Sequence, residues 1–334
     1  MAFALYRQPY SDVYVEVRYD GTPVALNDYE SLDGLSGFVI APFSITPQSP
    51  LLLIPAEGAL VTEHRLDGTT ALSELRQREA SADVAASYRE DFEKFHGAIL
   101  SGRFAKLVLA RSSEHTIDKS VDVQSLFYNV CRSYPRAMVM LFDTPQSGTW
   151  LIASPEILLD RQQSQFCTMA LAGTMPYREG LPQWSEKNKA EQHLVEQYID
   201  GIVSERSSQI IKDGPRTVRA GNLMHLRTDF RFRLRAEVSL GQLLSALHPT
   251  PAVCGLPKAE AREFIRENES LVRRYYSGFA GPLNLRSETH LYVSLRCMSL
   301  ADGVVTTYVG GGIMPESVVE DEWTETELKQ ITYV

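Results

Sequence analysis

The sequence predicts an α+β fold, because many strand-like segments follow one another and only a few long helical segments interrupt them. Two observations support a folded globular protein. Hydrophobic residues make up 44% of the 334 residues, which suffices for a large core. The chain also shows no internal repeat and no low-complexity tract. Strands and helices do not alternate one by one, so a parallel βαβ sheet is not predicted.

The first third of the chain begins with strands. Residues 1–80 have short apolar segments separated by proline and glycine, for example GLSGFVIAPF and PLLLIPAEG. Residues 81–100 are predicted to form a helix, because apolar side chains recur there at helical spacing: Val84, Tyr88, Phe92, Phe95 and Ile99. A strand over 106–117 (KLVLARSSEHTI) and a helix over 125–133 follow.

The rest of the chain continues the pattern. Four short strands are predicted between residues 137 and 173, followed by a long helix over 184–207. A strand at 225–234 and a helix at 258–268 come next. The segment HLYVSLRCMSLADGVVTTYV is predicted to be two strands joined at Asp302-Gly303, a strong hairpin signal. A final helix includes 323–329.

Charge and cysteine content narrow the classes of function. The net charge of −9 argues against nucleic acid or an anionic membrane as a partner, although local arginines still allow a small anionic ligand. The first residues, MAFALYRQPYSD, contain no signal-peptide core, and no segment is apolar enough to span a bilayer. The four cysteines form no CxxC pair and no zinc spacing. We therefore expect a cytoplasmic protein.

The C-terminal segment VGGGIMPESVVEDEWTETELKQI concentrates carboxylates after three glycines. On a helical wheel, Glu322, Glu325 and Lys329 share an arc of roughly 60°, and the acids at 320 and 327 fall on the opposite, solvated side. This face is either a surface Glu–Lys pair or part of a cation site. The glycines permit close approach to a ligand, and a structural turn is the alternative.

The helix over 184–207 contains a second unusual acid. Glu191 points into its apolar sector, and a carboxylate facing the core must be neutralised, hydrogen-bonded or bound to a metal. Lys187 lies one turn earlier on the same side. An intrahelical Lys187–Glu191 pair and a metal site are equally compatible with this pattern.

Eight motifs in order resemble the chorismate-utilising enzymes, and among these the isochorismate synthases most closely. They are KLVLAR, ASPEILL, LAGT, SEKNKAEQHLV, LHPTPAVCG, VSLRCMSL, GGGI and EWTETELK, between residues 106 and 329. The resemblance implies antiparallel β-sheets in a central sandwich with helices packed outside. It also implies one chorismate-binding catalytic domain over 1–334, with a variable β-rich part (1–80) and a motif-bearing part (81–334).

The resemblance also implies catalytic and metal-binding roles. Lys106 matches the lysine that activates water, and Glu156 matches the general acid; their ordinary alternatives are an exposed lysine and a turn carboxylate. Glu191 and Glu325 match ligands of Mg²⁺, the expected cofactor. Glu322 is either a third ligand or a residue beside them. Mg²⁺ prefers such hard oxygen ligands.

Further positions match substrate contacts. Arg296, expected in the middle of a strand, and Lys329 match residues that hold a substrate carboxylate, for which the guanidinium fork is suited. A cross-strand ion pair is the alternative for Arg296. The expected pocket lining consists of Gly173, Thr174, Ala252, Val253, Gly310, Gly311 and Gly312, with His225 as an outside candidate. His248 is expected to be structural.

The implied activity is that of an isomerase of the hydroxymutase type, isochorismate synthase, in which water adds at C2 of chorismate and the C4 hydroxyl leaves. Lys106, and Ala172 where some ammonia-using relatives carry lysine, favour water as the nucleophile. Salicylate synthase and a catalytically poor chorismate-binding protein are the alternatives. We expect a monomer without a glutamine amidotransferase subunit. With no partner domain appended and no secretion signal, we expect a role in menaquinone rather than siderophore biosynthesis.

Overall fold

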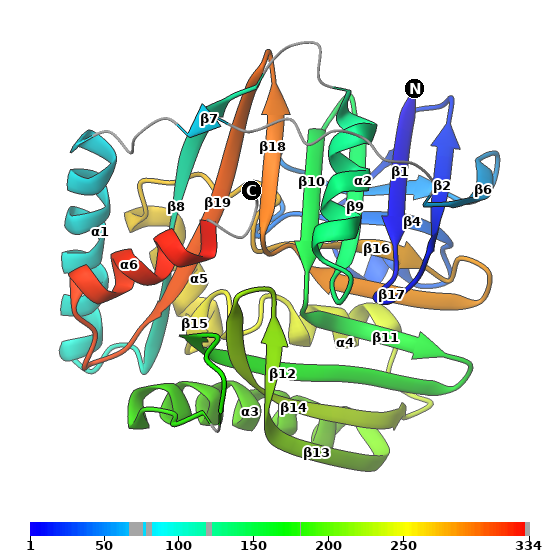
Figure 1. Ribbon diagram of the computed structural model, residues 1–334. Coiled ribbons are helices and arrows are strands. Elements are labelled where there is room, and N and C mark those ends of the chain that lie inside the picture. Colours follow the sequence, from blue (N-terminus) through cyan, green and yellow to red (C-terminus); the bar gives the residue numbers. More distant parts are fainter. Residues whose placement is uncertain (67–75, 78–81, 118–121, 181, 331–334) are drawn as a thin grey trace.

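Two antiparallel sheets form the body of the protein. The computed structural model describes residues 1–66, 76–77, 82–117, 122–180 and 182–330. Within these residues every strand pairing is antiparallel. The predicted α+β fold with antiparallel sheets is therefore confirmed (Figure 1).

Sheet I contains the strands that will carry one wall of the site. Its order is β15 (Gly255–Leu256), β8 (Lys106–Thr116), β19 (Val304–Ile313), β18 (Cys297–Ala301), β10 (Gly148–Ser154), β9 (Met138–Thr144), β1 (Ala2–Arg7), β2 (Val13–Tyr19) and β6 (Leu60–Arg65), and β7 (Arg76–Gln77) pairs with β8.

Sheet II carries the opposite wall. Its order is β13 (Ser207–Ala220), β14 (Leu223–Leu234), β12 (Gln165–Pro176), β11 (Ile157–Gln162), β17 (Glu288–Val293), β16 (Phe279–Leu283), β4 (Gly37–Ala41), β5 (Leu51–Pro55) and β3 (Val24–Leu26). Strands from the N-terminal 66 residues thus belong to both sheets. A buried aromatic and aliphatic cluster between the sheets, which includes Phe38, Phe142 and Trp150, joins them.

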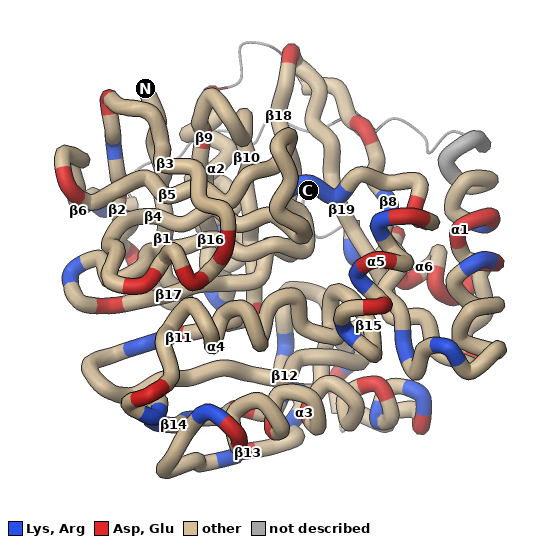
Figure 2. The backbone as a smooth tube through the Cα atoms, turned by 180° about the vertical axis from the view of Figure 1, so that it is seen from behind, with Lys and Arg blue, Asp and Glu red and all other residues tan. Residues whose placement is uncertain are grey.

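The helices cover the sheets from outside. They are α1 (Ala82–Leu100), α2 (Val123–Ser133), α3 (Glu186–Arg206), α4 (Leu240–Leu247), α5 (Lys258–Asn268) and α6 (Val319–Gln330), with a 3₁₀ turn, η1 (Glu30–Leu32). Helix α3 packs on β12 and β14, and α6 crosses β19 (Figure 1). Figure 2 shows charged residues on the helices and on the loops and outer strands, whereas the central strands β9 and β10 carry few. None of the helices in the described ranges is both long and apolar enough to cross a bilayer.

Local sequence explains where the helices begin. The side chains of Asp122 and Ser185 accept hydrogen bonds from backbone N–H groups at the starts of α2 and α3. Ser239 and Gln242 form a reciprocal capping box at the start of α4. The predicted helices at 125–133, 184–207, 258–268 and 323–329 are present within a few residues. Residues 67–75 and 78–81, where further strands and the start of the first helix were predicted, lie outside the described residues.

The prediction of one strand before the Asp302-Gly303 turn is wrong. Strand β17 ends at Val293 in sheet II, and β18 begins at Cys297 in sheet I. Arg296 lies in the break between them with a left-handed φ of 47°, not in the middle of a strand. Apolar residues continue through the break, so their pattern does not reveal that the chain changes sheets. The polar strand β13 and the short helix α4 were also missed.

A second change of sheet lies beside the first. The chain leaves sheet I at the end of β10 and enters sheet II at β11, with Pro155 and Glu156 between them. Ala153 N–H donates to the Arg296 carbonyl at 3.0 Å, and Val293 N–H donates to the Glu156 carbonyl at 3.0 Å. The two crossovers therefore brace each other and place Glu156 and Arg296 at the junction of the sheets.

Candidate active site at the junction of the two sheets

A cavity opens where the sheets meet, and we call it the inner cavity. The space between its walls is about 660 Å³, including the open space at its mouth. Its walls come from both sheets, from α3 and from α6. Twelve residues predicted from the sequence line it: Glu156, Gly173, Thr174, Glu191, His225, Ala252, Val253, Arg296, Gly310, Gly311, Gly312 and Lys329.

The three glycines belong to β19 and do not form a turn, so the structural-turn alternative is wrong. They pair with β8 across sheet I, Gly312 opposite Val108. A Cβ atom on Gly312 would overlap Glu191 Oε1 and lie 2.8 Å from Lys106 Cε. A Cβ on Gly311 would lie 3.3 Å from Glu322 Oε2 and 3.5 Å from Glu325 Oε1. The glycines thus allow three glutamates and a lysine to gather over one strand.

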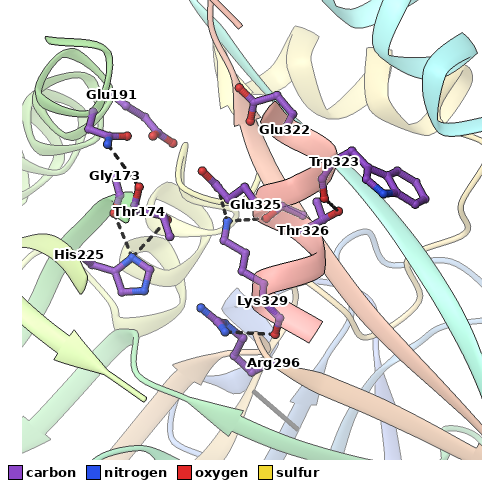
Figure 3. Close-up of polar contacts among 12 residues, drawn as sticks. Gly173, Thr174, Glu191, His225, Arg296, Glu322, Trp323, Glu325, Thr326 and Lys329 are labelled. Carbon is purple, nitrogen blue, oxygen red and sulfur yellow. Dashed lines mark hydrogen bonds and ion pairs between the residues drawn. The ribbon is translucent and has the colours of Figure 1, made fainter. Parts of the chain in front are cut away.

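Each of these glutamates contacts a lysine. Lys106 Nζ lies 2.8 Å from Glu191 Oε1, and Lys329 Nζ lies 2.7 Å from Glu325 Oε1. Lys187 pairs with Glu322 on α6. The ion pair of Lys187 therefore runs between helices rather than along α3, and Glu191 is paired with β8 instead. The Glu325–Lys329 pair expected along one helix is formed (Figure 3).

Burial and charge act against each other on these carboxylates. Burial would raise the pKa of Glu191, but the charges of Lys106, Lys329 and Lys187 outweigh it and hold the pKa below its usual value. The pKa of Glu322 is raised, because burial and the Glu325 carboxylate outweigh Lys187. The two carboxylates thus face different electrostatic environments a short distance apart.

The donor set suits a hard divalent cation. Glu191 enters from α3, and Glu322 and Glu325 project from α6 toward the same space (Figure 3). Each glutamate is paired with a lysine. Within the described ranges, no group of three His, Cys, Asp or Glu side chains lies close enough together to hold a metal ion by itself. Mg²⁺ commonly takes one or two protein carboxylates and completes its shell with water and ligand oxygens, a requirement these residues fit.

Glu156 is a carboxylic acid in an apolar environment. Only 2% of the surface of Glu156 is accessible to solvent. Burial raises its pKa to about 8, against the opposing effects of the Lys106 charge and of a hydrogen bond from Thr250. Glu156 therefore keeps its proton at neutral pH. A protonated carboxyl on a cavity wall can deliver a proton to a leaving hydroxyl.

The opposite part of the cavity is cationic. Lys329 Nζ donates to the Gly310 carbonyl at 2.7 Å, and Arg296 Nη1 donates to the Lys329 carbonyl at 3.2 Å. These contacts hold both cations beside the glycine strand (Figure 3). An arginine and a lysine on one wall form a binding surface for a carboxylate.

His225 is neutral. Burial, with the charges of Arg296 and Lys329, lowers its pKa to about 3. Its Nδ1 lies 3.0 Å from the Gly173 carbonyl, which can only accept, so Nδ1 carries the hydrogen and Nε2 is an acceptor. His248, expected to be structural, does not line the inner cavity. It is buried, with Nε2 3.2 Å from the Pro42 carbonyl.

Gln192 is a supporting residue that the sequence analysis missed. It is buried next to Glu191, accepts a hydrogen bond from Ala172 N–H at 2.8 Å, and donates to the Ala170 carbonyl at 3.2 Å. These bonds fix α3 to β12 and so set the position of Glu191. The signal that could have revealed it was an uncharged polar residue among the apolar positions of α3.

Comparison with known proteins places the chain in a family. Residues 57–332 match the family model described as chorismate binding enzyme. The chain belongs to the chorismate binding enzyme family. This family member is 30% identical over 237 residues to isochorismate synthase EntC of Escherichia coli (strain K12), a match that covers 68% of this chain and 61% of the relative.

Other relatives agree with this assignment. The salicylate biosynthesis isochorismate synthase of Pseudomonas aeruginosa is 32% identical over 266 residues, covering 75% of this chain and 55% of that protein. The chain thus matches less than two thirds of the length of either relative. The structure of MenF, the menaquinone-specific isochorismate synthase from Escherichia coli, shares the fold with a TM-score of 0.81 at 22% identity, covering 100% of this chain and 88% of that one.

Proposed function

We propose that this protein is an isochorismate synthase, which converts chorismate reversibly to isochorismate. The observation that carries the proposal is the buried carboxyl of Glu156 on one wall of a cavity whose other walls present Arg296, Lys329 and Glu191, with Lys106 directly behind Glu191. A cyclic diene with two carboxylates and a leaving hydroxyl requires such a set: a proton donor, a proton acceptor and cations for the carboxylates. The names of the two relatives described above support the same activity.

The proposed reaction balances without a further reactant. In this step Lys106 acts as the free amine, after the ion pair with Glu191 has been released: water attacks C2 of the ring and gives up a proton to this amine, the ring double bonds shift, and the C4 hydroxyl leaves as water with the proton of Glu156. One water enters and one water leaves, so chorismate and isochorismate are isomers. Because the reverse reaction exchanges the roles of acid and base, both groups must be held near the ring in both directions.

Binding of the ring is assigned to the cationic wall and the glycine strand. Arg296 and Lys329 pair with a carboxylate of the substrate. The backbone of Gly310–Gly312 allows the ring to approach, and Gly173, Thr174, Ala252 and Val253 complete the pocket. The neutral His225 accepts a hydrogen bond at Nε2, which suits a substrate hydroxyl.

We further propose that Glu191 and Glu325 hold Mg²⁺, with Glu322 beside them. Bound there, the ion would neutralise and orient the carboxylate attached to the ring. Lys106, Lys187 and Lys329 now neutralise these glutamates, so their charges set how strongly the glutamates attract a cation. Glu191 and Glu325 come from different helices, so their joint participation depends on the packing of α3 and α6 around β19.

A product assay tests the proposal. Purified protein is mixed with chorismate and Mg²⁺, and products are separated by chromatography with a coupled assay for pyruvate. Isochorismate without pyruvate is the expected result. Salicylate with pyruvate would show that the protein is a salicylate synthase instead. Saturable chorismate binding without turnover would show a binding protein. The Glu156→Gln variant, which keeps the shape and lacks the acid, controls for contaminating activity.

The biological setting is a separate proposal. We propose that the isochorismate feeds menaquinone rather than a siderophore, and that the protein acts as a cytoplasmic monomer without a glutamine amidotransferase subunit, a membrane or nucleic acid. The menaquinone assignment is tested by deleting the gene in its host and measuring menaquinone. We expect menaquinone to be lost, and added isochorismate-derived intermediates to restore it. Normal menaquinone with lost siderophore would contradict it.

A further inference from the structure

A second, larger cavity adjoins the inner cavity, and we call it the outer cavity. Its volume is about 1900 Å³ including its mouth. Four residues line both cavities: Pro155, Leu171, His225 and Arg296. These residues come from the two sheet crossovers and from β12 and β14. The two cavities therefore meet at the junction of the sheets, where the proposed acid and the proposed carboxylate-binding arginine lie.

The charged side chains that line the outer cavity are all positive. It contains four arginines and, among the described residues, no aspartate, glutamate or lysine. The net charge of the whole chain is −9, so this lining runs against the overall charge. Two of the arginines are already engaged: Arg227 pairs with Asp229 at 2.7 Å, and Arg296 belongs to the inner site.

The other two arginines line the outer cavity from different sheets, and their positive charges are not paired with a carboxylate of the described residues. Arg136 lies between α2 and β9 on the side of sheet I, and Arg219 lies in β13 of sheet II. Both are exposed, and neither forms an ion pair with a carboxylate in the described part of the chain. Arg219 is held in place, since its guanidinium lies 3.8 Å from the Tyr177 ring centre and its Nε donates to the Gly221 carbonyl at 2.8 Å.

Three exposed arginines on other parts of the surface show a different arrangement. Arg89, Arg216 and Arg266 each contact a carboxylate within ion-pair distance. Their field is therefore largely cancelled at short range. At Arg136 and Arg219 no such cancellation occurs, and the low-dielectric walls of a concave surface concentrate the remaining field at its mouth. Such a surface raises the local concentration of anions and their rate of association.

We propose that the outer cavity is an entry chamber that captures the dianionic ring substrate through Arg136 and Arg219 and delivers it to Arg296. The nature of this ligand rests on the proposed function. The positive charges follow one another along the path of the substrate: first Arg136 and Arg219, which we call the rim arginines, then Arg296, and then Lys329. Arg136 and Arg219 act on association and take no part in the bond changes.

The test measures the association rate constant of chorismate by stopped-flow tryptophan fluorescence. The chain is compared with Arg136→Glu, Arg219→Glu and the double variant at about 20 mM and about 500 mM salt. The matched control is the double variant Arg262→Glu/Arg266→Glu on α5, which makes the same change in net charge as the double rim variant, away from the cavity. Circular dichroism and melting temperature establish that all variants are folded. Turnover is measured separately in the product assay.

The expected result is a loss of association rate of about tenfold in the double variant at low salt, with smaller losses in each single variant. The loss shrinks to less than about twofold at high salt, where charges are screened within a few ångström. The control changes by less than about twofold, and kcat at saturating chorismate is unchanged in all variants. Equal effects of the double variant and the control, or a loss that salt does not reduce, would overturn the proposal.

This result is separable from that of the proposed function. If the unaltered protein binds chorismate but forms no isochorismate, the proposed activity fails, and the association rates still decide whether the outer cavity recruits the dianion. If it forms isochorismate and the rim variants associate at the unaltered rate, the activity stands and the entry chamber fails.

Discussion

Two buried ion pairs flank strand β8, and they differ in how fully the protein satisfies them. The pair Glu269–Arg273 is almost completely buried, and Arg273 donates two hydrogen bonds of 2.6 Å to the carboxylate. Arg273 also donates to the Val108 and Val253 carbonyls at 2.7 Å, and Ala110 N–H donates to Glu269 at 2.8 Å. The protein itself therefore uses most of the bonding capacity of this pair.

The pair Lys106–Glu191 is less complete. Lys106 Nζ contacts Glu191 at 2.8 Å and makes no hydrogen bond of good geometry to any described residue. Glu191 lies on the cavity wall, where its carboxylate occupies the space that a side chain at Gly312 would fill. The comparison teaches that a buried ion pair with spare bonding capacity next to a cavity indicates ligand chemistry, whereas a saturated pair indicates scaffolding.

The largest effect on activity is expected from removing the Lys106 side chain from the incomplete pair. Lys106→Ala should lower kcat by at least about 10³-fold, because it removes the proposed proton acceptor. The fold should survive, since Lys329 and Lys187 still compensate Glu191. Steady-state product formation and circular dichroism measure the two effects. Near-normal turnover by the folded variant would remove Lys106 from the mechanism.

The matching change in the saturated pair should act on stability instead. Arg273→Met leaves Glu269 buried without its partner, which typically costs about 3–5 kcal/mol. Urea unfolding measures the loss. The double variant Arg273→Met/Glu269→Gln, which also removes the stranded charge, should recover part of the stability. A stable single variant with lost activity would contradict the division between scaffold and site.

Substitutions at two glycines, one in the site and one in the scaffold, test the same distinction between activity and stability. Gly312→Ala places a methyl group against the flexible ends of Glu191 and Lys106, so these side chains must shift and kcat should fall about 10- to 100-fold with little change in stability. Gly278→Ala meets the backbone of Ala41 and Pro42, which cannot yield as easily, and should cost about 1–3 kcal/mol. Activity and urea unfolding of both variants are measured. Equal stability losses would contradict the assignment of Gly312 to the site.

A smaller effect is expected from pH. The pKa of Glu156 is raised to about 8, so the acid form dominates below pH 8 and is lost as the pH rises above it. Forward turnover should therefore fall by about tenfold between pH 7 and pH 9. The same shift makes the contribution of Glu156 to stability greatest below its ordinary pKa and smaller as the pH rises toward 8. A rate that stays constant from pH 7 to 9.5 would argue against Glu156 as the acid.

The sequence predicted the elements better than their connections. Helix 258–268 and the turn at Asp302-Gly303 follow from local periodicity and turn chemistry, and the structure contains both. The change of sheet at Arg296 was not predictable from periodicity, because residues on both sides of the break satisfy the same apolar pattern in different sheets. The family motifs named the residues around the inner cavity, although spacing alone left Glu191 and Glu325 with ordinary alternatives.

Long-range contacts explain the remaining differences. An intrahelical pair of Lys187 with Glu191 was one of the two alternatives from the sequence, and Lys187 instead pairs with Glu322, which is 135 positions later in the chain. Glu327 was expected on a solvated face, and it pairs with the buried Arg111 of β8. Arg136 and Arg219 of the outer cavity lie in segments with no motif, so only the meeting of the two sheets makes them one surface.

The most direct test of the central claim is the Mg²⁺ dependence of isochorismate formation in Glu191→Gln compared with the unaltered protein. We predict saturable activation by Mg²⁺ in the unaltered protein, a shift of at least about tenfold to higher Mg²⁺ in the variant, and a lower maximal rate. Identical activation curves for the two proteins, or full activity of both with Mg²⁺ chelated, would contradict the claim that the glutamates over the glycine strand hold the ion.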